Sequence, residues 1–160
     1  IPEDTFEYIL KKNLVPLIEK AEKEHNIEPK WFGTLLGHTM KRIEGKYKAA
    51  GGFDHSSILD MVIFLDKENI DREIIQYMLP EYYQHPQMDF DSVLTSINFK
   101  KIPKEEVLSK VPYLKEKYQE VKEKDGEGAK VRWIMGQLHR NAIGNINLTE
   151  LESFIEQQQN

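Results

Sequence analysis

Apolar residues recur along most of the chain at intervals of three and four, the spacing of one face of an α-helix. The clearest such stripes are Ile74, Ile75, Met78, Leu79 and Tyr82, and then Val131, Ile134, Met135 and Leu138. No alternating run rich in β-branched residues lasts long enough to form a strand. The pattern therefore predicts an all-α protein.

Helix boundaries are indicated by prolines, glycines and one asparagine in the first half of the chain. Pro16 has no N–H to donate, so a helix that begins near the N-terminus is expected to stop and restart there. Asn26 is expected to close that second stretch, and Pro29 suits the first turn of the next helix. Gly51-Gly52 is expected to end that helix.

The helical pattern is interrupted at His85-Pro86-Gln87, which predicts a domain boundary. We therefore expect an N-terminal helical bundle over residues 1–86 and a small C-terminal helical lobe over residues 87–160. Within this lobe the charged, glycine-rich run Lys122–Gly128 predicts a surface loop. Asn147 with Glu150 three residues later has the spacing of a capping box and predicts the start of a final helix.

Composition adds limits on the class of protein. Hydrophobic residues make up 39% of the chain and charged residues 31%, as in an ordinary globular protein. No apolar run approaches the ~20 residues that a membrane span requires. There is no cysteine, in agreement with a reducing compartment, so a cytoplasmic location is expected. The net charge of −5 means that any contact with nucleic acid must be local.

Catalytic chemistry is not indicated. The five histidines do not form H-E-x-x-H, and the chain has neither a G-x-S-x-G elbow nor a phosphate-binding glycine loop. We expect no catalytic residue, no metal site and no cofactor. The chain begins at Ile1 without a methionine, so we expect it to be part of a longer polypeptide whose chemistry lies elsewhere.

Two local clusters of basic residues are candidates for contact with RNA phosphates. One is Lys41, Arg42, Lys46 and Lys48. The other contains Lys130, Arg132 and Arg140, within a segment from 128 to 145 that has no acidic residue. Solubilising surface charge is the alternative interpretation of both clusters.

The sequence also has aromatic and small residues with a structural explanation. Tyr77, Tyr82 and Tyr83 could stack on bases, but at helical spacing they are expected to be core and rim residues. Gly33 and Gly37 are expected to let a neighbouring helix approach closely.

The order of several motifs resembles the tail of the GatB/GatE family, which is also found as free-standing YqeY-type proteins. The motifs are Trp31-Phe32-Gly33, Met40-Lys41-Arg42-Ile43-Glu44-Gly45, Ile58-Leu59, Ile63-Phe64-Leu65, Ile70-Asp71-Arg72-Glu73, and Ile134-Met135-Gly136-Gln137-Leu138-His139-Arg140 followed by Gly144. The family typically has a Gly-Gln-Val-Met-Lys segment, then a glycine and a closing helix. His139 stands where methionine is usual, and Ile143 where a basic residue is frequent.

The resemblance implies a non-catalytic, tRNA-binding tail with a YqeY-like C-terminal lobe. These subunits belong to the ATP-dependent ligase that converts Glu-tRNA(Gln) to Gln-tRNA(Gln), in which an amidase-type partner subunit acts with the catalytic body. The implied partners are therefore tRNA and, through the parent chain, that amidase-type subunit. The implied RNA-binding residues are Lys130, Arg132, Gln137 and Arg140, with Lys41, Arg42, Lys46 and Lys48 as secondary candidates.

Two other readings of the sequence remain open. The chain is a protein–protein scaffold if Tyr77, Tyr82, Tyr83 or Trp133 docks a partner subunit, and an enzyme in its own right is the third reading. Gly136 and Gly144 are expected to be architectural residues that shape the small lobe.

Overall fold

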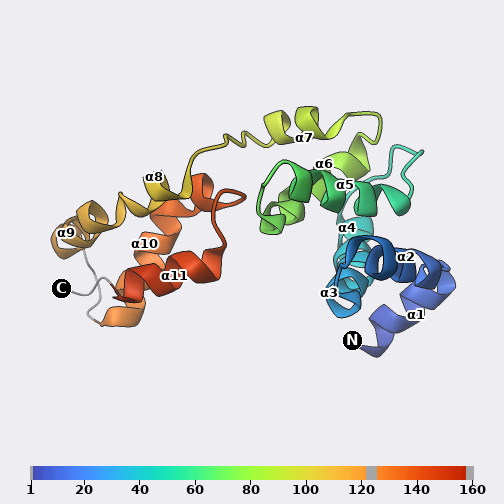
Figure 1. Ribbon diagram of the computed structural model, residues 1–160, viewed down its shortest axis with the longest axis horizontal. Helices are drawn as coiled ribbons and strands as arrows, with labels where there is room; N and C mark the ends of the chain where they lie inside the picture. The colour runs from blue at the N-terminus through green and yellow to red at the C-terminus, as the bar shows by residue number, and fades with distance from the viewer. Residues whose placement is uncertain (1, 122–125, 158–160) are drawn as a thin grey trace. The chain divides into compact units, whose positions relative to one another are not determined.

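The protein is all-helical, as the hydrophobic pattern predicts. A computed structural model describes residues 2–121 and 126–157, and within these ranges it contains helices and no strand (Figure 1). The elements of the first half are α1 (Glu3–Lys11), α2 (Val15–His25), α3 (Pro29–Thr34), η1 (Leu35–Thr39), α4 (Met40–Lys46), α5 (Ser56–Lys67) and η2 (Arg72–Ile74). They are followed by α6 (Ile75–Gln84), α7 (Phe90–Ser96), α8 (Lys104–Leu108), α9 (Val111–Val121), α10 (Glu127–Ala142) and α11 (Leu148–Gln157).

Most helix boundaries have a local chemical cause. The residues at or just after the ends of α1, α2, α5 and α7 are left-handed asparagines, namely Asn13, Asn26, Asn69 and Asn98. Asparagine adopts this conformation more readily than other non-glycine residues, so it stops a helix at little cost. The restart at Pro16, the closure at Asn26 and the opening at Pro29 are confirmed.

Two boundary predictions need correction. α4 ends at Lys46, before Gly51-Gly52, so Lys48 lies beyond the helix. The Asn147 side chain accepts hydrogen bonds from the Thr149 and Glu150 amides, but the Glu150 carboxylate pairs with Lys104 at 2.9 Å instead of completing a capping box.

Part of the predicted surface loop Lys122–Gly128 lies outside the described residues. Of that run, Gly126 directly precedes α10, and Glu127 and Gly128 belong to its first turn.

The chain forms two compact units. The first contains the residues up to Asn69 together with Ile75–Ile97, and the second contains Ile70–Ile74 together with the residues from Asn98 onward. The first unit thus continues past the predicted boundary at Pro86, because α7 packs on it: the Phe90 ring lies 5.5 Å from those of both Phe64 and Tyr82.

The first unit is organised around one long helical stretch formed by α3, η1 and α4. Its middle segment, Leu35–Thr39, is a π-helical turn, which inserts an extra residue and shifts the buried stripe around the axis. This shift lets Leu35, Leu36 and Gly37 all be buried in succession. A Cβ on Gly37 would overlap the Thr5 methyl group of α1, which confirms that this glycine permits close helix packing.

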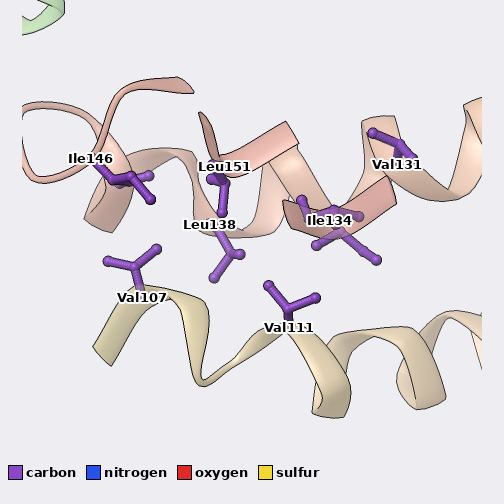
Figure 2. Packing of buried hydrophobic residues seen from close by; sticks show 9 residues of the cluster. Val107, Val111, Val131, Ile134, Leu138, Ile146 and Leu151 are labelled. Atoms are coloured by element: carbon purple, nitrogen blue, oxygen red, sulfur yellow. The ribbon is translucent and has the colours of Figure 1, made fainter. Parts of the chain in front are cut away.

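The second unit has a core of branched aliphatic side chains. Figure 2 shows Val107 of α8 and Val111 of α9 on one side, and Ile134 and Leu138 of α10 on the other. Ile146, from the turn before α11, and Leu151 of α11 also belong to this cluster. The buried stripe of α10 that the sequence predicts is confirmed at Val131, Ile134 and Leu138.

A short segment from the first half of the sequence belongs to this second unit. The Asp71 amide donates to the Gly144 carbonyl at 2.7 Å, and the Glu73 carboxylate accepts from the Leu148 amide at 2.8 Å. The Glu73 side chain therefore caps the start of α11 from 75 residues away in sequence. Burial raises the pKa of Glu73, against the effect of that amide.

Candidate nucleic-acid interface

The face of α10 opposite its buried stripe carries the main predicted site. Arg132, Gly136 and Arg140 recur at intervals of four, so they form one row along the helix, and Gln137 lies beside it. All four residues are exposed. Because each residue advances the helix by about 1.5 Å, the two guanidinium groups start from backbone positions about 12 Å apart along the axis.

Both arginines are available for a charged ligand. Within residues 2–121 and 126–157, no ion pair joins Arg132 or Arg140 to a carboxylate. An exposed guanidinium presents five N–H donors in a rigid fork, which matches the oxygens of a phosphate group. The row therefore offers two phosphate-binding groups on a rigid element.

Gly136 lies between these arginines, and its structural interpretation from sequence is wrong. A Cβ built there would meet no atom within 4 Å, so the glycine permits no close packing in the second unit. Glycine in a helix interior costs about 1 kcal/mol relative to alanine. The residue thus weakens the helix with no compensating contact, and it leaves a bare patch of backbone between two cations.

Gly144, by contrast, is architectural, as the sequence predicts. Its φ is +85°, and an added Cβ would lie 2.7 Å from the Phe99 ring, 2.9 Å from the Ile74 Cδ1 and 3.3 Å from the Ile70 Cγ2. The chain can turn here only without a side chain.

Acidic side chains surround one end of the row. A hollow of about 370 Å³ is lined by Arg132 together with Glu127, Glu152 and Glu156. These carboxylates reduce the positive potential near Arg132. Neither Gln137 nor Arg140 lines the hollow, so the C-terminal half of the row is the more favourable end for an anion.

Lys130 is half-buried and has a basic neighbour, Lys115, that is not among the residues predicted from the sequence. The Nζ of Lys115 is buried with no hydrogen-bond partner among the described residues. Burial lowers the pKa of Lys115, and the nearby Lys130 charge lowers that pKa further. Lys115 lies between Val111 and Tyr118 at helical spacing, so it is on the buried stripe of α9, and this spacing is the sequence signal for its position.

The second predicted cluster lies in the first unit and is partly neutralised. Lys41 pairs with Asp4 at 3.3 Å, and this ammonium lowers the pKa of the Asp4 carboxyl. Lys46 lies over the Tyr47 ring at 5.5 Å. Arg42 and Lys48 are exposed. The geometry therefore favours the α10 row over this cluster.

Most of the aromatic residues that would dock a partner subunit, if the chain were a protein–protein scaffold, are packed against other side chains of the chain. Tyr82 and Tyr83 are buried and contact the Phe53 ring, as expected for core residues at helical spacing. Trp133 packs on Tyr118 with ring centroids 5.6 Å apart. Of the three tyrosines, Tyr77 alone is exposed, at 42%.

In the described part of the chain, no group of three or more histidine, aspartate or glutamate side chains is arranged to hold a metal ion. None of its helices is both long and apolar enough to cross a membrane.

No family model, curated protein or solved structure matches this chain. The resemblance to the GatB/GatE tail therefore rests on the quoted motifs, whose sharpest part is the α10 segment from Ile134 to Arg140 and the following Gly144.

Proposed function

We propose that this chain is the non-catalytic, tRNA-binding tail of a GatB/GatE-type subunit of a Glu-tRNA(Gln) amidotransferase. The observation that carries the proposal is the exposed row Arg132, Gly136 and Arg140 on α10, with Gln137 beside it. Three of these residues, Gly136, Gln137 and Arg140, also belong to the motif that gives the resemblance to that family, and Arg132 lies two residues before it.

The physical argument concerns shape and charge. RNA helices are recognised mainly through phosphates and sugar hydroxyls, so a binding surface needs cations and close approach more than base-specific groups. Arg132 and Arg140 supply the cations, and the Gln137 amide supplies both donors and acceptors for hydroxyl groups. The missing side chain at Gly136 lets a strand of RNA lie against the helix backbone between them.

In this proposal the chemistry belongs to other parts of the enzyme. The parent chain would carry the ATP-dependent step that forms the new carbon–nitrogen bond, and an amidase-type partner subunit would supply the nitrogen. The helical chain would add affinity for tRNA in the cytoplasm and would bind no cofactor itself.

A salt series of tRNA binding tests the proposal. We expect the Arg132→Ala/Arg140→Ala variant to lose two phosphate contacts, so the slope of log affinity against log salt falls by about 2. At 0.1 M salt this corresponds to about sixtyfold weaker binding. Filter binding with glutamine tRNA and unrelated tRNAs measures both quantities.

The matched control is Lys104→Ala/Lys117→Ala, which removes two positive charges from the same unit. Both lysines are ion-paired, Lys104 with Glu150 and Lys117 with Glu120. This control should bind tRNA almost as the unchanged chain does. An equal loss in both variants would show a net-charge effect and reject the α10 row, and absence of tRNA binding at low salt would reject the function.

The bare glycine gives a second test that does not change charge. We expect Gly136→Leu to increase helix stability, because leucine is a good helix former and its Cβ would meet no atom within 4 Å. The same side chain would hold RNA away from the helix and remove at least one phosphate contact, which is about eightfold in affinity at 0.1 M salt. Thermal unfolding and filter binding on one preparation separate these effects.

Gly45→Leu is the control for this steric test. Gly45 is also an exposed helix glycine with nothing within 4 Å of an added Cβ, but it lies on α4. We expect that variant to keep its tRNA affinity. A loss in Gly45→Leu without one in Gly136→Leu would move the contact to the Lys41, Arg42, Lys46 and Lys48 cluster.

A further inference from the structure

A second hollow, of about 400 Å³, lies in the first unit beside the starts of α2 and α5. Its lining includes the cationic or titratable side chains of Lys12, Lys20 and His55 and the apolar side chains of Leu14 and Leu17. The hollow is shallow and open to solvent, so a ligand there would be contacted from one side. None of these residues belongs to the predicted RNA surface.

The charges around this hollow favour an anion. Lys12 and Lys20 form no ion pair with a carboxylate among the described residues, and the Lys12 Nζ lies 5.8 Å from the centre of the Tyr8 ring. The carboxylate in the lining is Asp54, which accepts the Ser56 amide at 2.8 Å at the start of α5. That hydrogen bond lowers the pKa of Asp54, so the carboxylate stays ionised. Its negative charge lies next to the positive N-terminal end of α5.

His55 is held in one orientation by a polar network behind the hollow. Its Nε2 lies 2.9 Å from the Tyr8 hydroxyl oxygen and 3.7 Å from the Glu44 Oε1. The Tyr8 hydroxyl donates its only hydrogen to Glu44, so it must accept from His55, which places a hydrogen on Nε2. The neutral ring is therefore the Nε2–H tautomer, and Nδ1 is the atom that takes up a proton.

The protonation of His55 reports on the charge in the hollow. Burial lowers the pKa of His55, and the neighbouring Lys12 charge lowers it further, while Glu44 and Asp54 raise it. A bound anion would offset Lys12 and favour the imidazolium form. Anion binding should thus be visible as a rise in the pKa of this one histidine.

We propose that this hollow binds a phosphate group, with the Lys12 and Lys20 ammonium groups as charged donors and His55 as a third donor. Leu14 and Leu17 provide an apolar surface for the part of the ligand that follows the phosphate. The phosphate can come from a free nucleotide or from an RNA backbone. The site is independent of the α10 row, so neither proposal requires the other.

The test is a titration of the histidine resonances by NMR with inorganic phosphate, adenosine 5′-monophosphate and a short single-stranded RNA as separate probes. We expect the pKa of His55 to rise with saturable dependence on phosphate, while the chemical shifts of His25, which does not line the hollow, do not respond to the ligand. The His55→Gln variant assigns the resonance. Tighter binding of the mononucleotide than of phosphate, without competition from RNA, would identify a free nucleotide, and competition by RNA would identify the backbone.

The matched variants are Lys12→Gln/Lys20→Gln and Lys11→Gln/Lys23→Gln. The two pairs come from the same two segments of chain and change the net charge equally, but Lys11 and Lys23 do not line the hollow. We expect about tenfold or greater weakening of phosphate binding in the first pair and none in the second, because charge-assisted hydrogen bonds need direct contact. No saturable response to any probe, or equal weakening in both pairs, would overturn the proposal.

Discussion

We expect Gly144→Ala to destabilise the second unit by about 3 kcal/mol, through the combined cost of backbone strain and overpacking. An alanine at φ +85° is strained, and its Cβ would overlap the Phe99 and Ile74 side chains and press on that of Ile70. Domains of this size are stable by only about 5 to 15 kcal/mol, so the loss is a large fraction of the total. Urea unfolding followed by Trp133 fluorescence, in a Trp31→Phe background, measures it.

Gly51→Ala separates the two costs. Gly51 has nearly the same φ, +86°, but an added Cβ meets nothing within 4 Å. This variant should therefore lose only the strain component, about 1 kcal/mol. Equal small losses in both variants would mean that the three side chains around Gly144 move aside at no cost, and would contradict the architectural role.

The second large effect is expected from Phe32→Ala in the first unit, at about 4 kcal/mol. Phe32 is fully buried in α3 at 0% exposure, so the substitution removes a whole aromatic ring and leaves a cavity. Urea unfolding followed by Trp31 fluorescence, in a Trp133→Phe background, reports on this unit.

Phe6→Ala is the same chemical change at an exposed site. Phe6 is 51% exposed on α1, so its truncation leaves no cavity and should change the free energy of unfolding by less than about 0.5 kcal/mol. If Phe6→Ala were as damaging as Phe32→Ala, the assignment of Phe32 as a buried residue and of Phe6 as an exposed one would be wrong.

Much of the helical architecture was predictable because its signals are local. Pro16, Pro29 and Asn26 act through their own backbone geometry, so their effects do not depend on distant residues. The division into units was less predictable. The contacts of Asp71 with Gly144 and of Glu73 with Leu148 join residues far apart in sequence, and no periodicity records such a pairing.

The candidate site was predictable in composition but not in detail. Arg132, Gln137 and Arg140 lie on the exposed face because the apolar stripe of α10 fixes which face is buried. Gly136 and Gly144 look alike in sequence, yet one is exposed with nothing near it and the other is enclosed by three side chains. Only the three-dimensional neighbours separate a glycine needed for packing from one that leaves backbone bare.

The segment Ile70–Ile74 also has a consequence for the order in which the chain folds during synthesis. The ribosome delivers Glu73 long before it delivers Leu148, the amide that this carboxylate caps. The second unit therefore cannot close until the segment from Gly144 to Leu148 has emerged, and until then Ile70 and Ile74 lack the turn at Gly144 that covers them. The nascent protein thus exposes a short apolar stretch until the segment around Gly144 has been synthesised.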